Sequence, residues 1–197
     1  VDNFIVEFDR ALRSVVGSTP MRRAVPAPAH LSEATSETSL TEKNLLAEFG
    51  ARGVDASRVF FAGRLPRSEY LSRYRIADLF LDTSPYNAGT TASDALWAGL
   101  PVLTFLGNTF SSRVCASLLT AIGLPGLICN SQNEYEELAI TLGLDSNRYD
   151  SIKGRLAENR LTTVLFDNNA FTKSFEEALI QAHGLNANGA PPENIFI

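Results

Sequence analysis

Residues 79–105 read LFLDTSPYNAGTTASDALWAGLPVLTF and decide the fold of this 197-residue chain. The apolar run 79–81 predicts a buried strand, and the turn-forming residues behind it predict a loop. A helix opened by residues 90–94 is expected to end at Gly99, because a glycine with a proline soon after it is typical of a helix C-terminus. Residues 102–105 are apolar again and predict a second buried strand. The stretch therefore indicates one β-α-β unit of a parallel sheet.

The start of the helix in this unit suits an anionic ligand. Gly89 brings no side chain to it, while Thr90 and Thr91 add hydroxyl groups to the free backbone N–H groups of a helix N-terminus. Residues 91–94 also resemble a capping box, and most such boxes bind no ligand. Asp94 would repel a phosphate placed directly on it, so its carboxylate is better suited to accept hydrogen bonds from sugar or ribose hydroxyls. The spacing alone leaves an anion site and a simple cap as alternatives.

Two further apolar runs, 59–62 and 127–129, also precede predicted helices. Four strands alternating with helices imply an α/β fold with a Rossmann-like, doubly wound parallel sheet, in which ligands bind at the carboxyl ends of the strands. The helix expected after the first run places Arg67, Tyr70 and Arg73 on one face, because residues three apart are neighbours on a helix. That face either borders the ligand cleft or is an ordinary solvated surface.

The chain divides into two predicted parts. Residues 1–39 are expected to form an amphipathic helix followed by an irregular linker that is rich in proline, serine and threonine. Residues 40–197 are expected to form one Rossmann-like domain. Further helices are predicted at residues 40–52, 111–122, 148–159 and 169–183, and one more is predicted after Asn130 or Ser131. The helix at 169–183 is expected to pack through Phe171, Phe175 and Leu179.

The composition is that of an ordinary globular protein, with 45% hydrophobic and 20% charged residues. The net charge of −5 argues against a nucleic-acid or anionic-membrane partner, and no apolar run approaches the ~20 residues of a membrane span. Cys115 and Cys129 lie in apolar surroundings and are expected to be buried free thiols, which fits a reducing cytoplasm. The chain has only two histidines, which excludes a histidine-rich metal site.

Beyond these patterns, residues 82–104 (DTSPYNAGTTASDALWAGLPVLT) resemble the donor-binding half of the O-linked N-acetylglucosamine transferases and their bacterial relatives. The resemblance runs in register from about residue 58 to residue 197. It is carried further by TFSSRV at 109–114, EYE at 134–136, NRLTT at 159–163, LFD at 165–167 and PENIFI at 192–197. Such an ordered set of motifs is more specific than a lone glycine pattern. The resemblance implies that residues 40–197 are the C-terminal, nucleotide-sugar-binding half of a GT-B glycosyltransferase.

By the same resemblance, the chain belongs to a metal-independent, inverting enzyme that transfers N-acetylglucosamine from UDP to serine or threonine hydroxyls of proteins. The implied catalytic residues are Thr90 and Thr91, which would stabilise the leaving diphosphate. The implied donor-binding residues are Gly89, Thr90 and Thr91 at the diphosphate, Asp94 at the ribose, and Leu65, Arg67, Tyr70 and Arg73 at the uracil and ribose. No metal or other cofactor is implied, and the UDP-sugar is a co-substrate. The implied partners are the nucleotide sugar and an acceptor protein bound by the other half of the enzyme, without which the chain is expected to be inactive.

Some positions depart from the family pattern and leave alternatives open. The N-acetylglucosamine enzymes commonly carry histidine at the position of Gly89, whereas related protein-fucosylating enzymes carry glycine. Arg67 and Tyr70 stand where the family often has lysine and histidine, and the family's diphosphate-binding lysine has no counterpart. Another nucleotide sugar such as GDP-fucose, or a non-catalytic module that binds a nucleotide or a protein, therefore stays an alternative. Gly89 also has a purely structural interpretation, in which it permits a positive φ in the turn.

Overall fold

The computed structural model describes residues 24–26, 40–62 and 65–196. Within these residues the chain forms a four-stranded parallel sheet with the strand order β1-β2-β3-β4. The strands are β1 (Ala24–Pro26), β2 (Leu79–Leu81), β3 (Val102–Phe105) and β4 (Ile128–Cys129). The order follows the chain in one direction, which is the arrangement of one wing of a doubly wound sheet. The predicted α/β class with a parallel sheet is confirmed.

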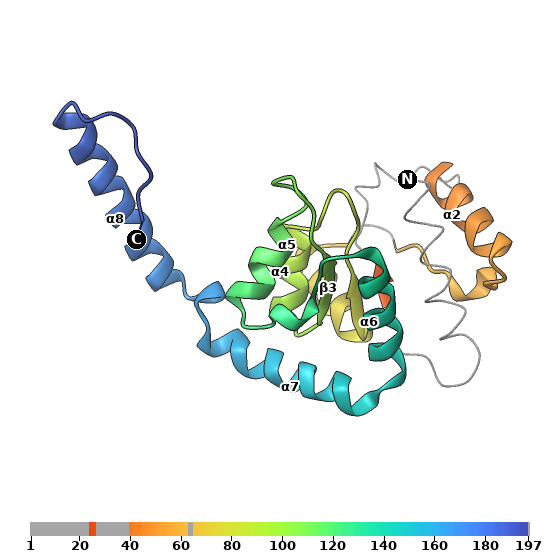
Figure 1. Ribbon diagram of the computed structural model, residues 1–197. Coiled ribbons are helices and arrows are strands. Elements are labelled where there is room, and N and C mark those ends of the chain that lie inside the picture. Colours follow the sequence, from red (N-terminus) through yellow and green to blue (C-terminus); the bar gives the residue numbers. More distant parts are fainter. Residues whose placement is uncertain (1–23, 27–39, 63–64, 197) are drawn as a thin grey trace.

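Helices cover both faces of this sheet. The α-helices of the described residues are α2 (Leu40–Ala51), α3 (Arg67–Arg73), α4 (Thr90–Trp97), α5 (Val114–Ala121), α6 (Gln132–Leu144), α7 (Ser146–Thr162) and α8 (Asn168–Ala187). Short 3-10 turns lie at η1 (Ala56–Arg58), η2 (Tyr74–Ile76), η3 (Pro125–Leu127) and η4 (Val164–Phe166). Figure 1 shows α4 and α5 on one side of β3 and α6 on the other. None of the helices in the described ranges is long and apolar enough to cross a membrane.

The core lies around the two central strands. Phe80 on β2 and both Val102 and Leu103 on β3 have no exposed surface, and Leu96 of α4 and Leu119 of α5 are equally buried against them. Each large apolar side chain buried in this way contributes about 1.5–3 kcal/mol. Because both faces of the sheet are covered here, β2 and β3 are mostly apolar runs, and this is why the sequence marks these two strands clearly.

Helix α7 ties down the C-terminal ends of the two crossover helices. Asn159 Nδ2 donates to the carbonyl oxygen of Ile122, 2.8 Å away, just after α5. Arg160 Nη1 donates to the carbonyl oxygen of Trp97 at the end of α4, at 2.7 Å, and its guanidinium lies 5.8 Å from the centroid of the Trp97 ring. The last carbonyls of a helix lack partners within the helix, and they carry partial negative charge. Asn159 and Arg160 of the NRLTT motif therefore hold the C-terminal ends of α5 and α4 in place.

Most of the predicted elements are confirmed, and one strand is wrong. The β-α-β unit of residues 79–105 and the helix predicted at 40–52 are found. The run 59–62 is not a strand, because no described strand pairs with it and Phe60 stays 87% exposed. The fourth strand is instead β1, which pairs with β2 and lies inside the predicted linker. The predicted N-terminal helix lies outside the described residues, and the domain boundary after residue 39 stays a prediction.

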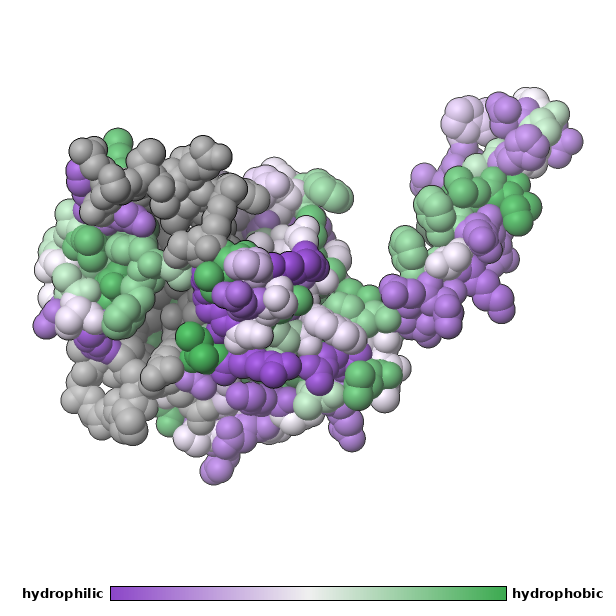
Figure 2. Space-filling model, turned by 180° about the vertical axis from the view of Figure 1, so that it is seen from behind, coloured by the Kyte–Doolittle hydropathy of each residue, from purple (hydrophilic) through white to green (hydrophobic). Residues whose placement is uncertain are grey.

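The packing predicted for the last helix is also wrong within the described structure. Helix α8 extends away from the sheet, and apolar side chains gather along it (Figures 1 and 2). Phe171 and Phe175 are stacked on each other, with ring centroids 6.0 Å apart, yet they are 67% and 54% exposed. Leu179 is 54% exposed as well. The apolar spacing correctly predicted a helix, but it did not reveal whether a described neighbour covers its face.

We expect Asn159→Ala to lower the free energy of unfolding by about 1–3 kcal/mol, because it leaves the Ile122 carbonyl at the end of α5 without its amide donor. Asn147→Ala is the control, since Asn147 lies exposed on the same helix and the substitution makes the same chemical change there. Urea unfolding followed by circular dichroism measures both. Equal stabilities of the two variants would contradict the capping role of α7.

Both cysteines are free and buried, as predicted. Burial raises the pKa of the Cys129 thiol to about 12 and raises the pKa of the Cys115 thiol even further. Since the thiolate is the reactive form, we expect neither cysteine to react with iodoacetamide at pH 8 while the protein is folded. Both should be alkylated rapidly in urea. Mass spectrometry of the labelled protein measures this, and fast labelling of the folded protein would contradict the burial.

Candidate functional site

The N-terminus of α4 lies at the carboxyl edge of the sheet, as predicted. The loop 82–89 leaves β2 at its carboxyl end and leads directly into α4. Gly89 is the N-cap residue, and no side chain caps the helix. The capping-box alternative is therefore wrong, because Gly89 and not Thr91 is the N-cap, and the Asp94 carboxylate contacts Arg67. Thr90 is exposed and Thr91 is half-buried, so backbone N–H groups and threonine hydroxyls occur together here.

Helix α3 lies beside this N-terminus and makes contact with it. Arg67 Nη2 is 3.2 Å from Asp94 Oδ1, although the two residues are 27 positions apart in sequence. Tyr74, which follows α3, has its hydroxyl hydrogen-bonded to the hydroxyl of Tyr70 and 3.4 Å from the carbonyl oxygen of Thr91. Burial raises the pKa of Tyr74 well above its ordinary value, so this phenol stays a hydrogen-bond donor. The described contacts thus join the α3 face to the first turns of α4.

The other two predicted residues lie at or near the two ends of α3. Leu65 precedes α3 and is 42% exposed, and Arg73 is the last residue of α3. The contacts of Arg67 and of the Tyr70–Tyr74 pair therefore bring the α3 face together with Thr91 and Asp94. These contacts exist without a ligand, and whether the residues bind one stays a prediction.

A buried carboxylate that sequence reasoning did not assign to the site supports the loop. Asp82 is only 2% exposed, and its Oδ1 accepts hydrogen bonds from the backbone N–H groups of Thr83 and Ala88, at 2.9 and 2.7 Å. Its Oδ2 accepts from Asn87 Nδ2 and Thr104 Oγ1, both at 2.6 Å. Burial raises the pKa of this carboxyl, and hydrogen bonds from Thr104, the backbone of Ala88, Asn87 and Cys115 oppose the rise. The sequence contains a signal for this network. Asp82 directly follows the apolar strand β2, and Thr104 is a polar residue within the otherwise apolar strand β3.

A second loop, residues 106–113, lies against the first. The backbone N–H of Asn87 donates to the carbonyl oxygen of Ser111 at 3.1 Å, which joins the two loops. Within the second loop, Ser112 Oγ lies 2.9 Å from both the backbone nitrogen and Oγ1 of Thr109. Tyr86 and Phe110, one from each loop, are 71% and 88% exposed. The carboxyl edge of the sheet therefore carries two hydrogen-bonded loops.

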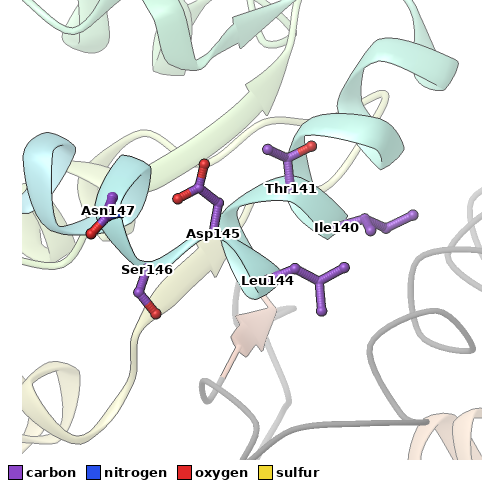
Figure 3. Close-up of a pocket in the computed structure, with 6 residues that line it drawn as sticks. All are labelled: Ile140, Thr141, Leu144, Asp145, Ser146 and Asn147. Atoms are coloured by element: carbon purple, nitrogen blue, oxygen red, sulfur yellow. The ribbon is translucent and has the colours of Figure 1, made fainter.

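A separate hollow lies at the other edge of the sheet from the junction of α3 and α4. It has a volume of about 600 Å³ and is lined by the end of α6 and the start of α7 (Figure 3). Its lining residues are Ile140, Thr141, Leu144, Asp145, Ser146 and Asn147. Because α6 starts at the carboxyl end of β4 and runs back along the sheet, its own end lies at the opposite edge. No predicted site residue lines this hollow.

In the described ranges, no group of three or more histidine, cysteine, aspartate or glutamate side chains is arranged to hold a metal ion.

The sequence profile of glycosyl transferase family 41 matches residues 37–175, which is more than half of the chain. The chain belongs to glycosyl transferase family 41. The resemblance seen in the sequence is thereby confirmed, and the matched range contains every predicted site residue.

Several members of family 41 are similar to this chain. The probable UDP-N-acetylglucosamine–peptide N-acetylglucosaminyltransferase SEC of Arabidopsis thaliana is 36% identical over 148 residues, which are 75% of this chain and 15% of that protein. The corresponding transferase of Caenorhabditis elegans is 33% identical over 73% of this chain and 12% of its own length. A solved structure of a mutant Thermobaculum terrenum O-GlcNAc transferase superposes with a TM-score of 0.75 at 28% identity, covering 89% of this chain and 32% of that one. This chain thus spans only a small part of the length of each of these relatives.

The second loop at this site gives a testable constraint. A methyl group added at Gly107 would overlap Ser112 Oγ and lie 2.5 Å from Ser112 Cβ, so Gly107→Ala must displace the loop. We expect the variant to lose about 1–3 kcal/mol of stability. Gly126→Ala is the control, because nothing lies within 4 Å of a methyl group there. Thermal unfolding compares the two variants, and equal midpoints would show that the loop does not pack as described.

Proposed function

We propose that the chain is the donor-binding part of an enzyme that transfers N-acetylglucosamine from UDP to serine or threonine hydroxyls of proteins. The observation that carries this proposal is the junction of α3 with the N-terminus of α4, which brings Arg67, Tyr70, Thr91 and Asp94 together at the carboxyl edge of the sheet, where they would bind the diphosphate and the ribose. The names of the matched relatives, which are UDP-N-acetylglucosamine–peptide transferases, support the same reaction. The acceptor protein would bind to the remainder of the enzyme.

The proposed chemistry depends on stabilising a leaving group. As the bond between the sugar and the diphosphate breaks, negative charge accumulates on the diphosphate oxygens. The N–H groups at the start of α4, with the hydroxyls of Thr90 and Thr91, would donate hydrogen bonds to these oxygens. A well-placed donor of this kind contributes about 3 kcal/mol to lowering a barrier. Attack by the acceptor hydroxyl from the opposite face of the sugar would invert the anomeric centre, and we propose that no metal ion takes part.

The contact between α3 and α4 also fits nucleotide binding. Asp94 is only 13% exposed at its side chain, whereas the Arg67 side chain is 73% exposed and free to change rotamer. Ribose hydroxyls would donate to the Asp94 carboxylate, and the displaced guanidinium could then turn toward the diphosphate, which it can bind in a bidentate manner. Leu65, Tyr70 and Arg73 would border the uracil and ribose.

Gly89 favours a second candidate, in which the donor is another nucleotide sugar such as GDP-fucose. Its φ is −103°, so the turn does not require glycine for a positive φ, although its ψ of −89° lies outside the range that residues with a side chain usually adopt. A methyl group added at Gly89 would meet only Val114 Cγ1, at an ordinary 3.5 Å. No neighbouring side chain therefore excludes a methyl group at this position. In the proposed complex a side chain here would lie beside the diphosphate, where it would select among sugars.

Isothermal titration of the 197-residue protein with UDP and with GDP tests both candidates. We expect weak but measurable UDP binding, weaker GDP binding, and about tenfold lower UDP affinity in Asp94→Ala and Thr91→Ala, which each remove one donor or acceptor. Thr120→Ala is the control, because Thr120 is exposed on α5 and its hydroxyl bonds only within that helix.

Each other outcome of this titration has a defined meaning. Tighter binding of GDP than of UDP would favour the second candidate. No heat with either nucleotide at millimolar concentration, in a sample shown to be folded by circular dichroism, would overturn the nucleotide site. Undiminished UDP affinity in both variants would overturn the assignment of the site residues.

A further inference from the structure

We propose that Thr104 is a positioning residue for the donor site: its hydroxyl fixes the buried Asp82 carboxylate, which in turn fixes the loop that delivers the N-terminus of α4. Thr104 does not reach the proposed ligand position itself. It would act through Asp82 and Asn87, and its effect on nucleotide binding rests on the function proposed above.

Thr104 is placed to organise both of these side chains. It lies on β3, is 1% exposed, and donates its hydroxyl proton to Asp82 Oδ2 at 2.6 Å. The same hydroxyl oxygen accepts a hydrogen bond from Asn87 Nδ2 at 2.8 Å. One hydroxyl on a rigid strand therefore orients the first residue of the loop and a residue near its end.

The carboxylate passes this orientation to the loop backbone. Asp82 Oδ1 accepts from the backbone N–H of Ala88 at 2.7 Å, and Ala88 directly precedes Gly89, the N-cap of α4. The carboxyl group thus bridges from the end of β2 to the start of the helix. A rotation of this carboxyl group would therefore shift the Ala88 peptide. This peptide directly precedes the α4 N–H groups that are proposed to bind the diphosphate.

The side chain of Asn87 depends on the same network for its position. Its Nδ2 donates to Asp82, to Thr104 and, at 3.3 Å, to the carbonyl oxygen of Phe105, while its buried Oδ1 has no hydrogen-bond partner. Its backbone N–H holds the second loop through Ser111. Removal of the Thr104 hydroxyl therefore loosens Asn87 as well as Asp82, and through Asn87 it loosens the contact between the two loops.

The test replaces the hydroxyl and keeps the shape. Thr104→Val removes both hydrogen bonds, and Thr104→Ser keeps the hydroxyl. Tyr135→Phe is the matched control, because the buried Tyr135 hydroxyl donates to the backbone carbonyl oxygen of Asp82 at 3.0 Å and not to its carboxylate. Backbone amide hydrogen exchange of residues 83–90, followed by mass spectrometry, reports the order of the loop without any ligand. Titration with UDP reports the site.

We expect Thr104→Val to exchange the amides of residues 83–90 at least tenfold faster and to bind UDP about tenfold more weakly. Thr104→Ser should restore most of both properties, and Tyr135→Phe should lower the unfolding midpoint but leave both near the original values. Unchanged loop exchange in Thr104→Val, or the same change in Tyr135→Phe, would overturn the proposal. Unchanged UDP affinity despite faster exchange would also overturn it. If the unaltered protein binds no UDP, the proposed function fails, and loop exchange still decides the role of Thr104.

Discussion

The burial of one carboxylate constrains the whole carboxyl edge of the sheet. An ionised carboxyl group taken out of water is unfavourable unless donors surround it. At Asp82 those donors come from its own loop and from β3, so the hydrogen bonds that make burial tolerable also dictate the course of the loop. The path from β2 to α4 is therefore a consequence of electrostatics as much as of apolar packing. The position of the α4 N-terminus follows from it.

The opposite edge of the sheet is secured by different means. There α7 supplies amide and guanidinium donors to the last carbonyls of α4 and α5, through Asn159 and Arg160. Each crossover helix is thus held at its C-terminus by α7, and α4 is also held at its N-terminus by the loop network. A helix fixed at both ends presents its free N–H groups in a constant direction, which is what a preorganised binding site needs. The rigidity of the site thus depends on residues on both edges of the sheet.

The sequence predicted correctly those elements whose determining residues lie close together along the chain. The β-α-β unit of residues 79–105 was recognisable because its apolar runs, glycine and proline follow one another closely. The strand predicted at 59–62 failed because a strand needs a partner, and propensity does not supply one. The capping box failed for a similar reason, since Arg67, 27 residues away, takes the Asp94 carboxylate. The role of Asp82 was missed because Thr104, its partner on β3, is 22 residues further along. The residues of the site were predicted by family resemblance, whereas their support required coordinates.

The division between inward and outward residues at this edge has an evolutionary consequence. Asp82 and Thr104 face the interior, whereas Gly89 and Arg67 face the rim, where an added methyl group at Gly89 meets nothing closer than 3.5 Å. Substitutions at the rim therefore leave the supporting hydrogen bonds intact. Changes at these two rim positions therefore do not have to be compensated by changes in the buried network during evolution.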